Sequence, residues 1–253
     1  MERLNVKTML LELTRECNLA CKHCFRGDSQ NVYMNTKIID YIFKNVCRIN
    51  EFLLTGGEPL LAKEQIKSVT DNIMKERINI GKTIIVTNGT VLSNDLIDML
   101  FQISKRTDLE IRLSNDAFHL MEIKEKGLES KREENIELLK SFFNVYVPED
   151  NVYFVDKVGR AKNLTDEDLD LINKNNPNTK YVFSNNRILQ EYRKAYPLPI
   201  LGEDNVVEGT LNIDVYGNIT PTYYSYDTED RNSYSIIKRN KTLKRIIDEV
   251  KTI

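Results

Sequence analysis

The sequence contains few of the features that mark nucleic-acid-binding, membrane or secreted proteins. Its 253 residues include no tryptophan, two histidines and four cysteines, and its 36 basic and 38 acidic side chains nearly cancel. Charge therefore predicts neither a nucleic-acid partner nor a membrane surface. No uninterrupted apolar run approaches the length of a bilayer-spanning helix, and the charged start of the chain is unlike a signal peptide. We expect a cytoplasmic protein whose thiols stay reduced.

The few cysteines gather in one place. Cys17, Cys21 and Cys24 fall within the stretch ECNLACKHCF. They can be buried small apolar residues or ligands of a structural zinc ion. Zinc takes four ligands, and His23 is a poor fourth one because it directly precedes Cys24. The remaining candidates are Cys47 and His119. Three thiolates without a good fourth ligand favour an iron–sulfur cluster with one iron left open to a small molecule.

Strands and helices are expected to alternate through the first half of the chain. Short apolar runs predict strands, and apolar residues at helical spacing predict the helices between them. The expected strands cover residues 8–14, 51–55, 83–87 and 109–114, and the expected helices cover residues 35–47, 62–78 and a segment capped by Ser93 that ends near Phe101. This order predicts parallel βαβ units whose polar and glycine-rich strand ends share one edge of the sheet.

The second half of the chain has a weaker pattern. We expect a charged helix over residues 129–143, strands over 151–155 and 181–184, a β-hairpin around Tyr216-Gly217-Asn218 and a basic helix over 241–251. Residues 142–155 are too few for a complete strand–helix unit. Any barrel built from these strands is therefore expected to be abbreviated.

Two motifs at neighbouring strand ends resemble those of a known family. Cys17-x3-Cys21-x2-Cys24 follows the first expected strand, and Gly56-Gly57-Glu58-Pro59 follows the second. Together they resemble the signature of the radical S-adenosylmethionine (radical SAM) enzymes. Thr87-Asn88-Gly89 and Ser114-Asn115-Asp116 stand where that family commonly has polar residues near its cofactor. The resemblance covers residues 8–116.

The resemblance implies a fold and a division of the chain. Residues 1–200 would form the α/β core, a partial and abbreviated (β/α)6-type TIM barrel. Residues 201–253 would form a small C-terminal α+β extension. We expect the cofactor site in the first of these two parts, because all of the motifs named above belong to it.

The resemblance also implies cofactors and their ligands. Cys17, Cys21 and Cys24 would hold three irons of one 4Fe-4S cluster, and S-adenosylmethionine (SAM) would bind the fourth iron. An electron from a donor such as flavodoxin or ferredoxin would cleave SAM to a 5′-deoxyadenosyl radical, which abstracts a substrate hydrogen. The residues implied around SAM are His23 at the adenine, Gly56, Gly57, Glu58 and Pro59 at the methionine, Thr87 and Asn88 near the cofactor, and Ser114 and Asp116 at the ribose or carboxylate. The resemblance identifies no catalytic acid, base or hydrogen donor.

Plainer explanations exist for several of these residues, and they rest on ordinary strand, turn and capping preferences. Cys47 can occupy a core position on the first helix, Gly56-Gly57 can end a strand, and Thr87-Asn88-Gly89 can form a turn. Ser114 and Asp116 can be a strand end and a helix cap, and His119 can be a surface or packed histidine. For Cys47 and His119 we expect the plainer explanation.

Two later stretches resemble a subgroup of the family. Val158-Gly159-Arg160-Ala161 resembles the GRA sequence of radical SAM enzymes with a SPASM extension, many of which modify ribosomally made peptides. Residues 211–222 resemble the hairpin that opens such an extension, but Thr222 stands where a cysteine is expected, and no cysteine follows Cys47. One spare thiol cannot hold a second cluster. We therefore expect an extension without auxiliary clusters that serves as a lid or substrate platform.

These features favour an enzyme that abstracts hydrogen from a ribosomally made peptide. A second possibility is a radical SAM enzyme that acts on a small molecule in cofactor or natural-product synthesis. A possibility from another class is a non-catalytic metal-binding or regulatory relic of the fold, although a relic has no physical reason to keep an open iron site. Few residues precede the first strand, so a peptide is expected to dock on the barrel, on the extension or on a separate protein.

Overall fold

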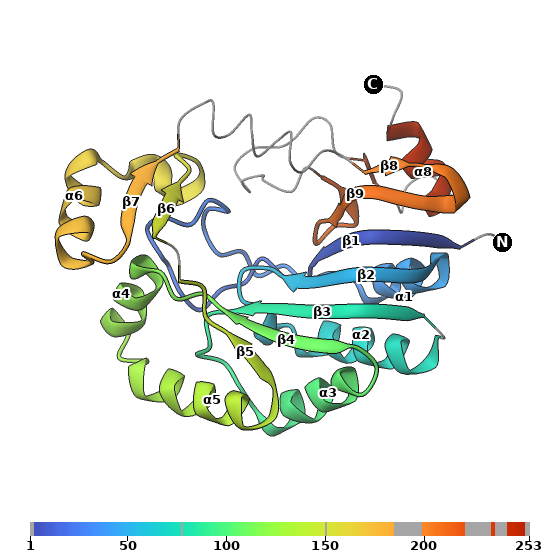
Figure 1. Ribbon diagram of the computed structural model, residues 1–253, viewed down its shortest axis with the longest axis horizontal. Coiled ribbons are helices and arrows are strands. Elements are labelled where there is room, and N and C mark those ends of the chain that lie inside the picture. The colour runs from blue at the N-terminus through green and yellow to red at the C-terminus, as the bar shows by residue number, and fades with distance from the viewer. Residues whose placement is uncertain are drawn as a thin grey trace.

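The computed structural model describes residues 3–76, 78–149, 151–184, 199–220, 234–235 and 242–250. Most of its strands form one curved sheet (Figure 1). In sheet order these strands are β11 (Tyr234–Ser235), β10 (Asn218–Ile219), β9 (Val206–Ile213), β1 (Leu4–Glu12), β2 (Val46–Thr55), β3 (Asn79–Thr87), β4 (Asp108–Leu113) and β5 (Asn144–Tyr146), and β8 (Ile200–Leu201) pairs with β9. All four strands expected in the first half of the chain overlap observed ones, namely β1 to β4.

The central strands run parallel, as βαβ units require. β1 pairs with β2, β2 with β3, β3 with β4 and β4 with β5, each in parallel. The C-terminal ends of these strands therefore lie at one edge of the sheet. Residues that follow the strands are brought together there although they are far apart in the sequence.

Helices cover the outer face of the sheet (Figure 1). They are α1 (Thr36–Asn45), α2 (Lys63–Lys75), α3 (Asn94–Ser104) and α5 (Glu129–Phe142). The apolar side of α1 is buried against the sheet through Ile38, Ile39, Ile42 and Phe43. The hydroxyl of Ser93 accepts a hydrogen bond from the backbone N–H of Leu96, which confirms the predicted cap of α3.

A smaller group of elements stands beyond the C-terminal ends of the strands (Figure 1, left). It contains α4 (Ala117–Glu125), β6 (Val152–Val155), the 3-10 helix η2 (Gly159–Asn163), α6 (Asp166–Asn175) and β7 (Lys180–Phe183). β6 and β7 form a separate parallel pair, and the described residues contain no pairing between β5 and β6. The barrel is therefore open at this point, which confirms the expected partial, abbreviated barrel.

The first helix is shorter than its apolar pattern predicted. α1 ends at Asn45, and β2 begins at Val46 and contains Cys47. The expected position of Cys47 in a helix core is therefore wrong. Its half-buried thiol donates to the carbonyl of Leu4 at 3.4 Å and to Asn5 Oδ1 at 3.2 Å. Parallel pairing of Val46 with Leu4 decides the conformation, because β-branched residues favour strands when a partner strand is present.

The second half of the chain agrees in part with its weaker pattern. The helix expected over residues 129–143 is α5, and the strands expected over 151–155 and 181–184 are β6 and β7. Strand β5 and helix α4 were not predicted. α4 carries apolar residues on more than one side, since Leu120 and Met121 are exposed while Phe118 and Ile123 are buried, so it lacks a clear helical stripe.

The C-terminal part of the chain contributes to the main core. β9 pairs in parallel with β1, and helix α8 (Leu243–Val250), within the segment expected to be helical, buries Leu243, Ile246 and Ile247 in that core. The predicted hairpin is confirmed as the β9–β10 connection. The expectation of a lid is wrong for these elements, because they complete the sheet. The division between residues 200 and 201 stays a prediction, and Thr222 lies outside the described residues.

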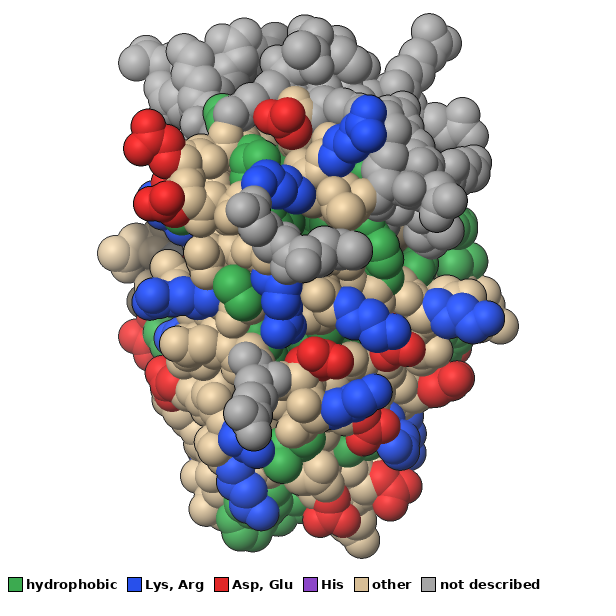
Figure 2. Space-filling model, turned by 90° about the vertical axis from the view of Figure 1, so that its right-hand side faces the viewer, with side chains coloured by type: hydrophobic (Ala, Val, Ile, Leu, Met, Phe, Trp, Pro, Cys, Tyr) green, Lys and Arg blue, Asp and Glu red, His purple; other side chains and the backbone are tan. Residues whose placement is uncertain are grey.

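The surface carries charges of both signs. Figure 2 views the side that lies at the right of Figure 1, and basic and acidic side chains are interspersed over the described part of that face. This distribution agrees with the balanced composition of the sequence. Within the described residues, none of the helices has the length and apolar character needed to cross a bilayer.

Candidate active site

A cavity of about 280 Å³ lies at the C-terminal ends of the central strands. One side is the cysteine loop, defined here as residues 14–30. The rest of the wall comes from the ends of β2, β3 and β4 and from His119, Tyr153 and Arg160. The predicted site residues that line it are Cys17, Cys21, His23, Cys24, Gly56, Gly57, Glu58, Asn88 and Ser114. The other three, Pro59, Thr87 and Asp116, are not among the lining residues but adjoin or contact residues that are.

The three predicted iron ligands are free thiols that share this cavity. Cys21 is buried, and Cys17 and Cys24 are partly exposed. Burial raises the pKa of Cys17 to about 12 and likewise raises the pKa of Cys21. Thiolates at these positions therefore need a positive partner, and a thiolate-bound metal supplies one. The loop fits the iron–sulfur cluster that the sequence motif implies.

The two glycines after β2 let this strand end run against the cysteine loop. A Cβ on Gly57 would lie 2.3 Å from the carbonyl oxygen of Glu16, and one on Gly56 would lie 2.5 Å from that of Thr14. Because no Cβ is present, the two backbones approach closely enough to form hydrogen bonds. The N–H of Gly57 donates to Thr14 O and that of Glu58 donates to Glu16 O, both at 2.8 Å. The backbone of the cysteine loop therefore leaves no room for a side chain at either position. This need for glycine was not apparent from the sequence.

Glu58 joins the ends of β2 and β3. Its buried carboxylate accepts hydrogen bonds from the Thr87 hydroxyl and the Asn88 backbone N–H at 2.8 Å, and from the Leu60 N–H at 3.0 Å. Burial raises the pKa of Glu58, although these three donors oppose the shift. Because its hydroxyl donates to Glu58, Thr87 lies behind the residues that line the cavity. Recognition of the methionine part of SAM by Glu58 or by its neighbouring backbone groups stays a prediction.

Asn88 ties the turn after β3 to the cysteine loop. Its side-chain amide donates to Asn18 Oδ1 at 2.9 Å, and the Asn18 amide donates to the Thr90 hydroxyl at 2.7 Å. The loop is thus fastened to two different strand ends, through Gly57 and through Asn88. A ligand in the cavity would meet a wall held by several hydrogen bonds.

Asp116 holds two histidines and the start of α4. Its Oδ1 accepts from the backbone N–H groups of Phe118 and His119, which confirms the helix cap, and Oδ2 lies 2.5 Å from His119 Nδ1. His23 Nε2 lies 3.4 Å from Asp116 Oδ1, and its ring stacks on Phe118. Burial alone would raise the pKa of Asp116, but His23 and His119 hold it well below its usual range. Burial lowers the pKa of His23.

Comparison with known proteins identifies the family. The profile of the Radical SAM superfamily matches residues 11–155, which is more than half of the chain and includes all three cysteines of the loop. The chain belongs to the radical SAM superfamily. Enzymes of this superfamily use a 4Fe-4S cluster and SAM, so the cavity and the family agree on the kind of cofactor.

Relatives with named activities cover only part of the chain. An L-lysine 2,3-aminomutase of Buchnera aphidicola is 30% identical over 125 residues, which are 46% of this chain and 36% of that protein. A GTP 3′,8-cyclase of Clostridium perfringens is 32% identical over 116 residues, or 43% and 35% of the two chains. The chain thus spans well under half of the length of these relatives. By their names, these two relatives act on different molecules, lysine and GTP.

A solved structure extends the likeness to almost the whole chain. The structure described as native anSMEcpe with bound AdoMet and Cp18Cys peptide has a TM-score of 0.57 and 14% identity, and it covers 96% of this chain and 80% of that one. At this identity the likeness concerns the fold. It agrees with the open, mostly parallel sheet described above.

Sequence reasoning missed His119 in the radical SAM cavity. Its ring lines this cavity and also a neighbouring cleft of about 790 Å³. The contact with Asp116 occupies Nδ1, so Nε2 is the nitrogen left for other partners. The available signal was the spacing of three residues from Asp116 across the first turn of a helix. Without the helix α4, which was not predicted, that spacing had no meaning.

Glu12 is a second missed residue of this radical SAM protein. It is fully buried at the end of β1, and its Oε2 accepts from the N–H of Val215 at 3.1 Å and lies 3.5 Å from Arg15 Nε. Its Oε1 lies 3.8 Å from the Arg26 guanidinium. One carboxylate therefore connects both ends of the cysteine loop to the C-terminal part of the sheet. The signal was an acidic residue that closes an apolar strand.

Proposed function

We propose that this protein is an enzyme that abstracts a hydrogen atom from a ribosomally made peptide. The observation that carries the proposal is the single cavity in which the three cysteines meet the Gly56-Gly57-Glu58 turn and the residues after β3 and β4. When bound, the cluster and SAM supply the 5′-deoxyadenosyl radical after an electron arrives from a donor such as flavodoxin or ferredoxin. The protein supplies binding, orientation and exclusion of water.

Specific residues receive roles in this proposal. Cys17, Cys21 and Cys24 hold three irons, and the backbone edge at Gly57 receives the methionine part of SAM. Ser114 lies on the wall between the cavity and the neighbouring cleft, where a ribose hydroxyl can bond to it. Asp116 lines the neighbouring cleft and not the cavity, and its oxygens already accept from α4 and His119.

The neighbouring cleft is the proposed substrate site. It shares Val86, Ser114, His119 and Tyr153 with the cofactor cavity, so a substrate there would lie next to SAM. Its lining includes Asn115, Asn151 and Asn178, residues that carry side-chain amides. Amides both donate and accept hydrogen bonds, which suits the alternating N–H and C=O groups of an extended peptide. The cleft is lined by the end of β4, by the connection from β5 to β6, and by residues of β6 and β7.

A small molecule is the second candidate substrate. The lysine and GTP enzymes among the relatives favour it, and the polar lining of the cleft can also bind such molecules. A short precursor-peptide gene beside this one would favour the peptide. Mass spectrometry of that peptide after incubation with enzyme, SAM and reductant then tests the substrate. Unchanged peptide mass together with turnover of a small molecule would reverse the order of the two candidates.

Anaerobic reconstitution tests the enzyme itself. We expect one 4Fe-4S cluster in the wild type, none after joint replacement of Cys17, Cys21 and Cys24 by alanine, and 5′-deoxyadenosine only when the cluster is present. Cys47→Ala is the matched control, because its thiol contacts Leu4 and Asn5 on β1 and not the cavity. Zinc without iron in the wild type would refute the cluster, and a cluster without 5′-deoxyadenosine would favour the non-catalytic relic.

A further inference from the structure

The motif Val158-Gly159-Arg160-Ala161 has no role in the function proposed above. It lies in η2 and its entry, and it contacts the cysteine loop at Cys24 and Phe25. Gly159 has a φ of +57°, and a Cβ there would lie 2.4 Å from the carbonyl oxygen of Phe25 and 2.6 Å from that of Cys24. Only glycine combines this conformation with so close an approach.

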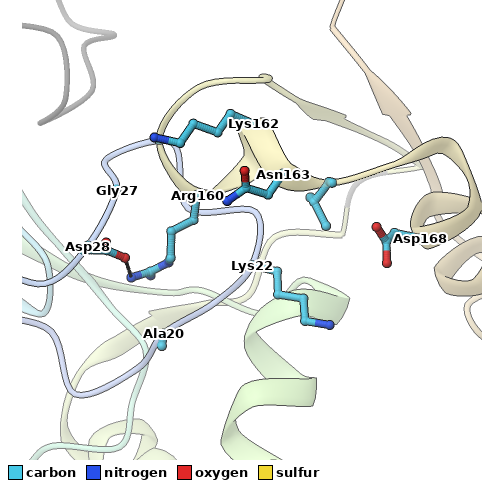
Figure 3. Close-up of a pocket in the computed structure, with 10 residues that line it drawn as sticks. Ala20, Lys22, Gly27, Asp28, Arg160, Lys162, Asn163 and Asp168 are labelled. Carbon is cyan, nitrogen blue, oxygen red and sulfur yellow. Dashed lines mark ion pairs between the residues drawn. The ribbon is translucent and has the colours of Figure 1, made fainter.

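Arg160 donates hydrogen bonds to the backbone carbonyl groups of two of the three loop cysteines. Its backbone N–H donates to Cys24 O at 2.9 Å, and its Nε–H donates to Cys21 O at 3.0 Å. The side chain extends from η2 across the loop toward Asp28, with an N–O distance of 3.6 Å (Figure 3). It lines the cofactor cavity as well as the pocket drawn in Figure 3.

The motif is itself held by apolar packing. Ala161 is fully buried in a cluster that includes Leu19, Cys21 and Leu164. Arg160 is only 18% exposed, whereas its partner Asp28 is 90% exposed. The ion pair therefore contributes little, and the hydrogen bonds to the loop carbonyls are the main interactions of the arginine.

We propose that Gly159 and Arg160 clamp the cysteine loop in its iron-ligating geometry, and that Arg160 is a positioning residue which also tunes the cluster. The role as a tuning residue rests on the proposed function. Groups that orient metal ligands affect metal retention, and a nearby positive charge favours the more negative, reduced form of a cluster. Loss of the arginine should therefore loosen the cluster and make its reduction potential more negative.

Four substitutions and one control separate these contributions. Arg160→Gln removes the charge and the guanidinium fork, and Arg160→Lys keeps the charge but loses the fork. Asp28→Asn removes only the exposed partner. Gly159→Ala adds the clashing Cβ, and Gly127→Ala is its control, because Gly127 also has a positive φ, of +63°, but no atom within 4 Å of the added Cβ.

Two measurements on reconstituted protein test the cluster. Under a chelator, we expect Arg160→Gln and Gly159→Ala to lose iron about tenfold faster than the wild type, with Asp28→Asn and Gly127→Ala unchanged. In a redox titration followed by electron paramagnetic resonance, Arg160→Gln should titrate at a more negative potential than Arg160→Lys. If Arg160→Gln lost iron at the same rate as the wild type, the proposed clamp would be overturned. If the two arginine variants had equal reduction potentials, the proposed tuning of the cluster by Arg160 would be overturned.

Hydrogen exchange in the metal-free proteins tests the clamp without any cluster. The backbone amides of residues 17–27 should exchange faster in Arg160→Gln and Gly159→Ala than in the wild type, Asp28→Asn and Gly127→Ala. Unchanged exchange would overturn the clamp. Failure of the wild type to take up iron would instead refute the proposed function, and the exchange result would still decide whether η2 holds the loop.

Discussion

The described residues form two hydrophobic cores of different size, and the cofactor cavity lies between them. The main core joins β1–β4 and β9 to the outer helices and α8. The smaller core joins β6, β7, α4 and α6 to the cysteine loop through Leu19 and Cys21. The strand ends of the main core present polar residues, and the smaller core seats the loop that carries the thiols. The site therefore depends on how the two cores are fastened together.

Damage to the main core should have the largest effect on stability. Leu211 on β9 is fully buried, so we expect Leu211→Ala to lower the free energy of unfolding by about 2–5 kcal/mol, as measured by urea denaturation. Leu171→Ala, at a residue of α6 that is 59% exposed, is the control and should cost about 0.5 kcal/mol or less. Equal effects of the two variants would mean that β9 is not part of one cooperative core.

The contact between the strand ends and the loop should come next. In Gly57→Ala the new Cβ would meet the Glu16 carbonyl, so the loop must shift, at a cost of about 1–3 kcal/mol. We expect less iron after reconstitution as well as less SAM cleavage. A glycine needed only for SAM would instead leave the iron content normal. Gly202→Ala is the control, since its added Cβ would lie 3.5 Å from its nearest neighbour.

A hydrogen bond from β7 to α4 should have the smallest effect. The backbone N–H of Ala117 donates to the Tyr181 hydroxyl at 2.8 Å. Tyr181→Phe removes the acceptor and should cost about 1 kcal/mol while hydrogen exchange of the Ala117 amide becomes faster. Tyr146→Phe serves as the control because Tyr146 is 47% exposed. An unchanged exchange rate at Ala117 would show that this bond does not link the smaller core to the site.

The first half of the fold and the positions of the motifs could be predicted from local patterns. Apolar runs marked β1–β4, and the residues that end each strand had to share one edge because the strands are parallel. The cap at Ser93 is likewise a local feature. The predicted residues Cys17, Gly57 and Asn88 consequently line one cavity, although their roles toward the cofactor stay predictions.

The remaining features depend on contacts between distant segments. Cys47 lies on a strand because Val46 pairs with Leu4, which no pattern within residues 35–47 contains. The constraint on Gly57 comes from the Glu16 carbonyl, and the role of Arg160 comes from Cys21, more than a hundred residues earlier in the sequence. The two cores also could not be distinguished, because both use the same kinds of apolar residue.

The place of β9 beside β1 has a consequence for synthesis of the chain. β1 pairs with β2 on one edge and with β9 on the other, and the β9 residues follow about 200 residues after their β1 partners. At typical translation speeds that interval lasts roughly 10–40 s. During this time the second edge of β1 lacks its native partner, and unpaired strand edges invite aggregation. The growing chain is therefore most exposed to misassembly at its first strand, until its last parallel strand has been made.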